Sequence, residues 1–312
     1  MVQTVCQEIG IPVPALAMTG SDPQILQLVA LAQREGRELA SFPVRDATWS
    51  ALQKQYLFTT QFLTLTGCSA TLGSAVVTVP STTGLAVGWA CPGSIGSGLA
   101  SSAVVLSITS TTSVTLDQVA TASATGLALT FGQIAYPFPA DYDHATNATF
   151  WDRQNRWQML GPLTAQEWQI LKSGVAPTGP CRRFRVQGNQ FLLDPPPTTN
   201  GVLVYEYTSS GFCAPSGTVV SPQSAAFQAS WLLDTDIGVL SEDLMTQGIK
   251  WRWLRAKGFA YDEEHRSYTD ARERMASRDG GGGRALILNR QFISSPLMSS
   301  AQIPDSGYGV SS

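Results

Sequence analysis

The sequence is poor in charge, and the charge it has is nearly balanced. Charged residues make up 14% of the 312 residues, below the roughly 25% usual for soluble domains. The formal net charge of -3 provides no basic field of the kind that holds nucleic-acid phosphates. A run of roughly 18 uncharged apolar residues, the minimum for a membrane-spanning helix, is also missing. The first residues carry Glu8 and lack a basic segment, so we expect no secretion signal and no membrane partner.

Cysteine and histidine are scarce, and the common catalytic motifs are missing. The five cysteines are Cys6, Cys68, Cys91, Cys181 and Cys213. None forms a CxxC pair, so neither a zinc site nor a disulfide framework is expected, and free thiols fit a reducing compartment during synthesis. His144 and His265 each lie beside acidic residues without metal-ligand spacing. No G-x-S-x-G, HExxH or P-loop occurs, so we expect no enzyme, no catalytic residue, no cofactor and no metal.

The charge is also unevenly distributed along the chain. Residues 61–135 contain a single charged residue, Asp117, and are rich in Ser, Thr, Gly and Ala. Apolar residues alternate within this segment, which is the periodicity of strands. The predicted inward-facing sets are Ala75, Val77 and Val79; Val104, Leu106 and Ile108; Val114 and Leu116; and Leu127, Leu129 and Phe131. Turn signals separate these runs, so we predict that 61–135 is a small all-β domain inserted between 1–60 and 136–279.

The flanking parts show both helical and strand patterns, which predicts an α+β fold. A helix is expected over 22–40, with Asp22 as the N-cap and Pro23 in the first turn. A short helix should begin at Thr164, where Glu167 completes a capping box. A hairpin is expected over 184–193, around a two-residue Gly-Asn turn. The longest helix is predicted over 241–278, with a possible interruption at Gly258.

Tryptophan and basic residues gather at three places in these flanking parts. The candidate subunit or partner contacts are Trp151, Arg153, Arg156, Trp157, Trp168, Lys172, Trp251, Arg252 and Trp253. Trp and Arg are enriched where proteins contact proteins. Burial of the tryptophans beneath a loop of the same chain is the alternative. The arginines could pair with acids of the same copy or of an adjacent copy.

The C-terminal part reads as an extended arm behind a glycine hinge. Residues 280–283 are four glycines, and residues 284–312 show no helical stripe. The apolar residues of the candidate portal-docking arm are Leu286, Ile287, Leu288, Phe292, Ile293 and Leu297. Such an exposed apolar segment is expected to dock on a partner, for example by adding a strand to a sheet.

Several stretches resemble a known group of phage proteins. They are Tyr136-Pro137-Phe138-Pro139-Ala140-Asp141-Tyr142, Phe150-Trp151-Asp152-Arg153-Gln154-Asn155-Arg156-Trp157, Gly161-Pro162-Leu163-Thr164-Ala165-Gln166-Glu167-Trp168-Gln169, Leu171-Lys172-Ser173-Gly174 and Lys250-Trp251-Arg252-Trp253-Leu254-Arg255-Ala256-Lys257-Gly258. Over about 1–60 and 136–279 the chain resembles the head-to-tail adaptors, or tail tubular protein A type, of short-tailed (podovirus-type) bacteriophages. The segment 61–135 departs from simple members and resembles Ig-like or adhesin-like β-domains.

The resemblance implies a structural function. Family members form a ring, commonly of twelve copies, beneath the portal, with a helical bundle near the portal and a β part facing the tail nozzle. DNA passes through the ring without sequence-specific binding. The implied location is the virion neck or tail, and the host cytoplasm during assembly. A receptor-binding or capsid-decoration protein that uses the Thr/Ser-rich β-domain is the alternative function.

Overall fold

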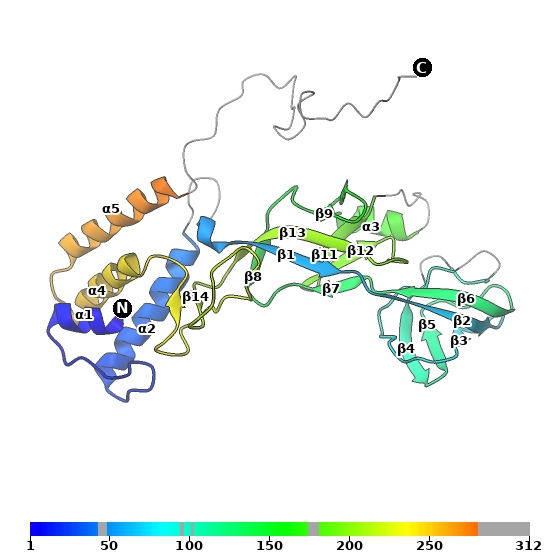
Figure 1. Ribbon diagram of the computed structural model, residues 1–312, viewed down its shortest axis with the longest axis horizontal. Coiled ribbons are helices and arrows are strands. Elements are labelled where there is room, and N and C mark those ends of the chain that lie inside the picture. The colour runs from blue at the N-terminus through cyan, green and yellow to red at the C-terminus, as the bar shows by residue number, and fades with distance from the viewer. Residues whose placement is uncertain (43–48, 94–96, 101–102, 174–180, 280–312) are drawn as a thin grey trace, which may run out of the picture.

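A computed structural model describes residues 1–42, 49–93, 97–100, 103–173 and 181–279 of the chain. The described residues form a mixed α+β protein whose parts follow one another along the longest axis (Figure 1). Helices from both ends of the described chain lie together at one end, two antiparallel sheets occupy the middle, and a third sheet lies at the other end. The predicted α+β class is therefore confirmed.

Four helices share one apolar core in the helical part. They are α1 (Val2–Ile9), α2 (Pro23–Ala40), α4 (Glu242–Lys257) and α5 (Asp262–Arg278). Leu28 and Leu39 of α2 pack in this core with Leu244 and Ile249 of α4. The predicted helix start is confirmed, because the Asp22 side chain accepts a hydrogen bond of 2.8 Å from the Gln24 N–H and Pro23 opens α2.

The helix predicted over 241–278 is two helices. Gly258 adopts the left-handed conformation, with φ of 77°, at the end of α4, and α5 begins at Asp262. A glycine tolerates this conformation because it has no Cβ, and it often ends a helix in this way. The helix α5 folds back on α4, which places the ring centroids of Trp251 and Tyr268 6.1 Å apart.

A charged cluster lies between α2, α4 and α5. Glu35 is fully buried and accepts a hydrogen bond of 2.6 Å from the Tyr268 hydroxyl. An Arg252 guanidinium nitrogen lies 2.7 Å from Glu35 and donates to Glu38 at 2.7 Å. Burial raises the pKa of Glu35, although Arg252 and Tyr268 act in the opposite direction. Glu35 fits here because Gly248 presents no side chain: a Cβ there would lie 2.2 Å from the Glu35 carboxyl carbon.

The middle part is a pair of sheets around an aromatic core. The larger sheet contains β1 (Gln53–Thr59), β13 (Val202–Ser209), β9 (Trp151–Asp152), β10 (Trp157–Gln158) and β8 (Tyr142–Ala145). The smaller contains β11 (Arg183–Gln187), β12 (Gln190–Asp194) and β7 (Ala135–Pro137). Phe58, Phe184, Phe191 and Tyr205 pack between them. The hairpin predicted over 184–193 is confirmed as β11 and β12.

Four short elements complete the flanking parts. The helix α3 (Ala165–Lys172) has the predicted capping box, because the Thr164 hydroxyl accepts from the Glu167 N–H and the Glu167 carboxylate accepts from the Thr164 N–H. The turn η1 (Ser50–Leu52) precedes β1. The strands β14 (Cys213–Ala214) and β15 (Ile237–Gly238) form a two-stranded sheet beside the helices.

The five-stranded sheet at the far end of the molecule from the helices has its own apolar core. It runs in the order β4-β5-β3-β2-β6, with bounds Val105–Ser110, Ser113–Leu116, Val76–Thr78, Phe62–Ala70 and Ala124–Gly132. Ala90 bridges to Val104 beside one edge strand and to Gly132 in the other, which joins the two edges into a small barrel. Val77, Val114, Leu129 and Phe131 are buried inside, as the alternation predicted.

One predicted strand face is wrong. Val105 is buried, whereas Leu106 and Ile108 are 62% and 39% exposed. The β4–β5 register shifts between Val105 and Ser107, and again between Ile108 and Ser110. An irregularity of this kind changes which side chains face inward, so simple alternation does not hold along β4.

We predict that residues 61–135 can be removed as a unit. The two chain ends of the barrel lie side by side, because the Gln133 N–H donates to the Gln61 carbonyl at 2.9 Å, and inserted domains require neighbouring ends. Replacement of 61–135 by a short Gly-Ser bridge should leave a soluble chain with a cooperative thermal transition. Insoluble protein, or loss of the transition, would show that the barrel is needed for the remaining core.

We predict that Gly248→Ala destabilises the helical part. The added methyl group must displace the buried Glu35 carboxyl group, and overpacking of this kind costs about 1–3 kcal/mol. Urea unfolding measures the change. Gln247→Ala, at the neighbouring and less buried position of α4, is the matched control and should change the stability little. An unchanged or raised stability of Gly248→Ala would contradict the packing.

Candidate interaction surface

The turn between β9 and β10 is held by one buried carboxylate. Asp152 is 1% exposed. It accepts hydrogen bonds from Arg182 Nε at 2.9 Å, from the Asn155 N–H at 3.0 Å and from Asn155 Nδ2 at 2.9 Å. Burial favours the neutral acid, but the hydrogen bonds from Asn155 and Arg182 outweigh it and hold the pKa of Asp152 below its ordinary value. The turn is thereby anchored to the core.

The rest of this turn faces outward. Trp151 and Trp157 are 43% and 41% exposed, so burial beneath a loop does not describe them. Arg153 and Arg156 are exposed, and no carboxylate among the described residues lies within 4.0 Å of either guanidinium. Arg156 has a φ of 58°, which a non-glycine residue adopts only at a cost. The two arginines are therefore presented to the surroundings without a partner in the described part of their own copy.

The two tryptophans lie on opposite faces of the sheet. Trp151 is paired with Val204, and Val204 with Leu57, so these three share the outer face. Trp157 is paired with Asp152, whose neighbour Leu203 faces the core. A shallow groove runs over the outer face beside the turn, and its lining includes Gln55, Thr149, Trp151, Arg153, Arg156, Val204 and Glu206. It combines an aromatic ring, two cations and two acids, Glu206 and the anchoring Asp152.

The other candidate contact residues are packed within the chain. Trp168, Trp251 and Trp253 are 6%, 8% and 6% exposed. Lys172 pairs with Asp194 and lies over the Trp168 ring. Arg252 belongs to the buried cluster with Glu35. For these residues the structure shows roles in the chain's own core.

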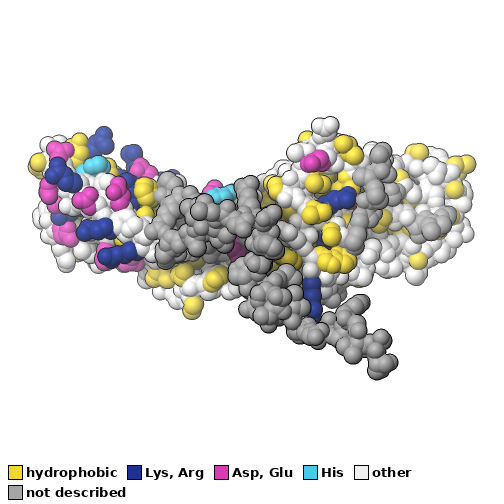
Figure 2. Space-filling view, turned by 90° about the horizontal axis from the view of Figure 1, so that it is seen from above, with side chains coloured by type: hydrophobic (Ala, Val, Ile, Leu, Met, Phe, Trp, Pro, Cys, Tyr) yellow, Lys and Arg dark blue, Asp and Glu magenta, His cyan; other side chains and the backbone are white. Residues whose placement is uncertain are grey.

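Side-chain types are divided along the molecule. Figure 2 shows charges of both signs gathered over the helical end, basic and hydrophobic side chains together over the middle, and a barrel end almost without charge on this face.

Among the residues the structure describes, no group of three or more His, Cys, Asp or Glu side chains is placed to hold a metal ion. Within the same residues, no helix combines the length and apolar character needed to cross a bilayer.

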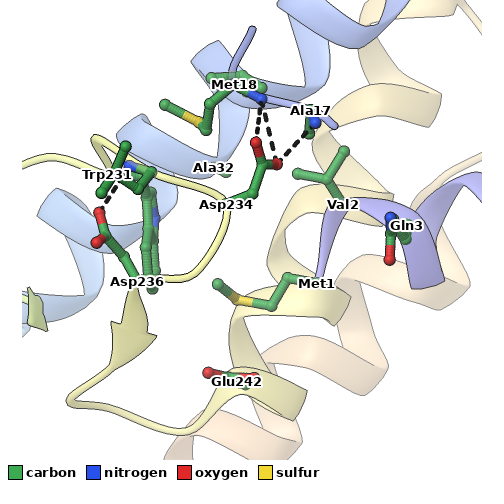
Figure 3. A pocket seen from close by; sticks show the side chains of 12 residues that line it. Met1, Val2, Gln3, Ala17, Met18, Ala32, Trp231, Asp234, Asp236 and Glu242 are labelled. Carbon is green, nitrogen blue, oxygen red and sulfur yellow. Dashed lines mark hydrogen bonds between the residues drawn. The ribbon is translucent and has the colours of Figure 1, made fainter. Parts of the chain in front are cut away.

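A pocket opens between α1, α2 and the loop 231–236 (Figure 3). Asp234 ties this loop to the segment before α2, because its carboxylate accepts from the N–H groups of Ala17 at 2.7 Å and Met18 at 3.2 Å. Trp231 Nε1 and Asp236 Oδ1 are buried without hydrogen-bond partners in the described part of the chain. Apolar side chains line the pocket together with Gln3, Asp234, Asp236 and Glu242.

The structure does not describe the residues of the candidate docking arm. Leu286, Ile287, Leu288, Phe292, Ile293 and Leu297 lie outside the described residues. The last described residue is Asp279, whose carboxylate accepts hydrogen bonds of 2.6 Å from both the N–H and the hydroxyl of Ser50. The arm therefore leaves the described structure beside η1 and the start of β1.

Residues 104–287, more than half of the chain, match the SU10 adaptor protein family. The chain belongs to this family. The match includes the last three strands of the barrel in sequence, the middle sheets with the Trp151–Asp152 strand, and helices α4 and α5. No curated protein matches the chain. The family is one of phage adaptors, which confirms the broad prediction of a phage adaptor that contacts other head or tail proteins in the virion neck.

We predict that Asp152→Asn destabilises the protein in a pH-dependent way. The change leaves the buried Arg182 guanidinium without a counter-charge, and breaking a buried pair costs about 3 kcal/mol. The folded-state pKa of Asp152 is depressed, so its stabilisation is present above the ordinary carboxyl pKa of about 4 and is lost as the pH falls through the folded value. Urea unfolding between about pH 7 and pH 2 should show the two proteins converging in acid.

The matched control is Asp143→Asn. Asp143 is 58% exposed, and the His144 ring is its one ion-pair partner among the described residues, so its replacement should change the stability little at any pH. A difference between wild type and Asp152→Asn that stays constant down to the lowest pH would contradict the charged role of Asp152.

Proposed function

We propose that this adaptor forms a ring below the portal of a tailed phage, with twelve copies as its resemblance to other adaptors implies. In this position it links the capsid to the tail nozzle and lets DNA pass. The role is structural and involves no catalysis. One observation carries the proposal in this chain of the adaptor family. The turn between β9 and β10, called here the Trp-Arg turn, is anchored by the Asp152–Arg182 pair. Its exposed Arg153 and Arg156 have no partner in the described part of their own copy.

The geometry of the turn suits a contact between copies. Guanidinium groups bind carboxylates in a bidentate manner, and Arg and Trp dominate the energetic centres of interfaces. Asp152 and Asn155 hold the backbone from the inside, so the backbone of Arg153 and Arg156 loses little further freedom when a partner arrives. A neighbouring copy in a ring presents the same complementary surface at every position.

The charge of the chain is compatible with DNA passing through the ring. Each lysine or arginine that engages phosphate adds salt-sensitive affinity for nucleic acid. With a net charge of -3, a ring of these chains would carry no overall attraction that would retain a moving duplex. The ring would therefore act as a conduit.

A second candidate function is receptor binding or capsid decoration by the barrel. Hydroxyl groups pair on its outer surface, with hydrogen bonds between Thr64 and Thr130 at 3.0 Å and between Thr109 and Thr115 at 2.8 Å. Such a surface suits an adhesive module. Rings that bind portal protein in electron micrographs favour the adaptor, whereas trimers that bind host cells favour the receptor binder.

We predict that the double variant Arg153→Glu/Arg156→Glu stays folded but loses ring formation. Both side chains are exposed, so the monomer should keep its thermal stability within about 0.5 kcal/mol, as surface substitutions usually do. The reversed charges would repel the carboxylates that the arginines bind in the neighbouring copy. Native mass spectrometry, with and without portal protein, measures assembly.

Arg266→Glu is the matched control for this experiment. Arg266 is 74% exposed on α5, and its one ion-pair contact among the described residues is a long one of 3.9 Å to Glu263, so this variant should assemble normally. Normal rings from the double variant would remove the turn from the interface, and a wild-type protein that never forms rings with portal protein would contradict the proposed function.

A further inference from the structure

The strand β1 has an open edge over its last residues. The Thr60 N–H bonds to the Gly201 carbonyl, and the β1–β13 register has no shift, so odd-numbered residues of β1 point their backbone groups away from β13. The Gln55 N–H meets the Pro222 carbonyl at 2.7 Å on that side. Leu57 and Thr59 have no such partner among the described residues. Two residues at the middle of the molecule therefore present unpaired strand edge.

Apolar side chains flank this edge on both faces. Leu57 is 47% exposed on the outer face, next to Val204 and the exposed Trp151. Phe58, on the inner face, belongs to the aromatic core. A strand added beside β1 could thus bury apolar side chains on both of its faces, beside Leu57 on one and beside Phe58 on the other. Exposed edges and apolar faces of this kind favour pairing with another extended segment.

The chain itself contains a segment that fits the edge. Residues 285–288 are Ala-Leu-Ile-Leu, apolar at four successive positions, so one pair of side chains can lie beside Leu57 and the other beside Phe58. Four glycines and Arg284 separate this run from Asp279, and these five residues span about 17 Å when extended. Asp279 is fixed to Ser50, three residues before the start of β1.

Ring symmetry places the exit of the arm and the start of the neighbour's β1 at the same level. A rotation about the ring axis keeps every residue at its own height along that axis. Because the arm leaves each copy beside the start of β1, it leaves at the level of the β1 strand of the next copy as well. Each copy would donate its segment to one neighbour and would accept a segment at its own edge from the other neighbour. Such a head-to-tail contact closes in a ring.

We propose that residues 285–288 of one copy add as a strand to the open edge of β1 in the neighbouring copy. This inference rests on the proposed ring and specifies one of its contacts. Residues beyond 288 remain available for the portal. The occupant is a second copy because the donor segment and the accepting edge are both present in every chain.

Backbone hydrogen exchange tests the proposal on assembled rings. The Leu57 and Thr59 amides should exchange at least about tenfold more slowly in rings of the full chain than in the chain truncated after Asp279, because a backbone hydrogen bond protects an amide. The Gln55 amide, already bonded to Pro222, serves as the internal control and should exchange equally in both. Leu286→Asp/Leu288→Asp should abolish the added protection, and Ile303→Asp, further along the arm, should retain it.

A photo-crosslinking residue at position 57 identifies the occupant. In rings assembled from isotopically labelled and unlabelled copies, crosslinks to residues 284–290 of a different copy support the proposal. Crosslinks only within one copy, or to another segment, overturn it, as does equal exchange of Leu57 in full-length and truncated rings. If rings of normal mass form but the edge stays unprotected, only this inference fails; if no rings form with portal protein, the proposed function fails with it.

Discussion

The structure depends on the hydrogen bonds of one buried carboxylate. Asp141 accepts from Lys54 Nζ at 3.0 Å, from the hydroxyls of Tyr207 at 2.9 Å and Ser209 at 2.7 Å, and from the Phe227 N–H at 2.9 Å. Burial disfavours its charge, but these donors prevail and its pKa is lowered. The donors come from β1, from β13 and from the loop that returns toward the helices. Because a buried Lys54 without Asp141 would be an unpaired charge, the three segments are fixed together.

The strand pair held in this way connects all parts of the molecule. β1 begins after η1 at the helical part and continues, after two residues, into β2 of the barrel. Its unshifted register with β13 sets which side chains face outward. That register places Leu57, Val204 and Trp151 in one row on the outer face, and Asp152 on the inner face where Arg182 reaches it. The exposed turn and the open edge are therefore consequences of the same pairing.

The sequence was informative where structure is decided locally. The Asp22 cap, the Thr164–Glu167 capping box and the Gly188-Asn189 hairpin turn each depend on residues within a few positions, and all are confirmed. The wrong face of β4 comes from register shifts that depend on its partner strand. The anchoring of the Trp-Arg turn was missed because Asp152 finds Arg182 thirty positions away. The one signal for this anchoring in the sequence is the single acid, Asp152, between Trp151 and Arg153.

The distribution of charge shows how a chain with few ionic groups can still be specific. Its best-formed pairs, Lys54–Asp141, Arg182–Asp152 and Glu35–Arg252, are buried and fix the geometry of separate parts. Surface ion pairs add little stability, and few are present among the described residues. Outside the helical part, the surface offers hydroxyl groups, scattered apolar side chains, and Arg153 and Arg156, which have no carboxylate partner among the described residues. Recognition by such a surface must come from a few arginines, shape and strand edges, since long-range electrostatic steering needs a charge excess that this chain lacks.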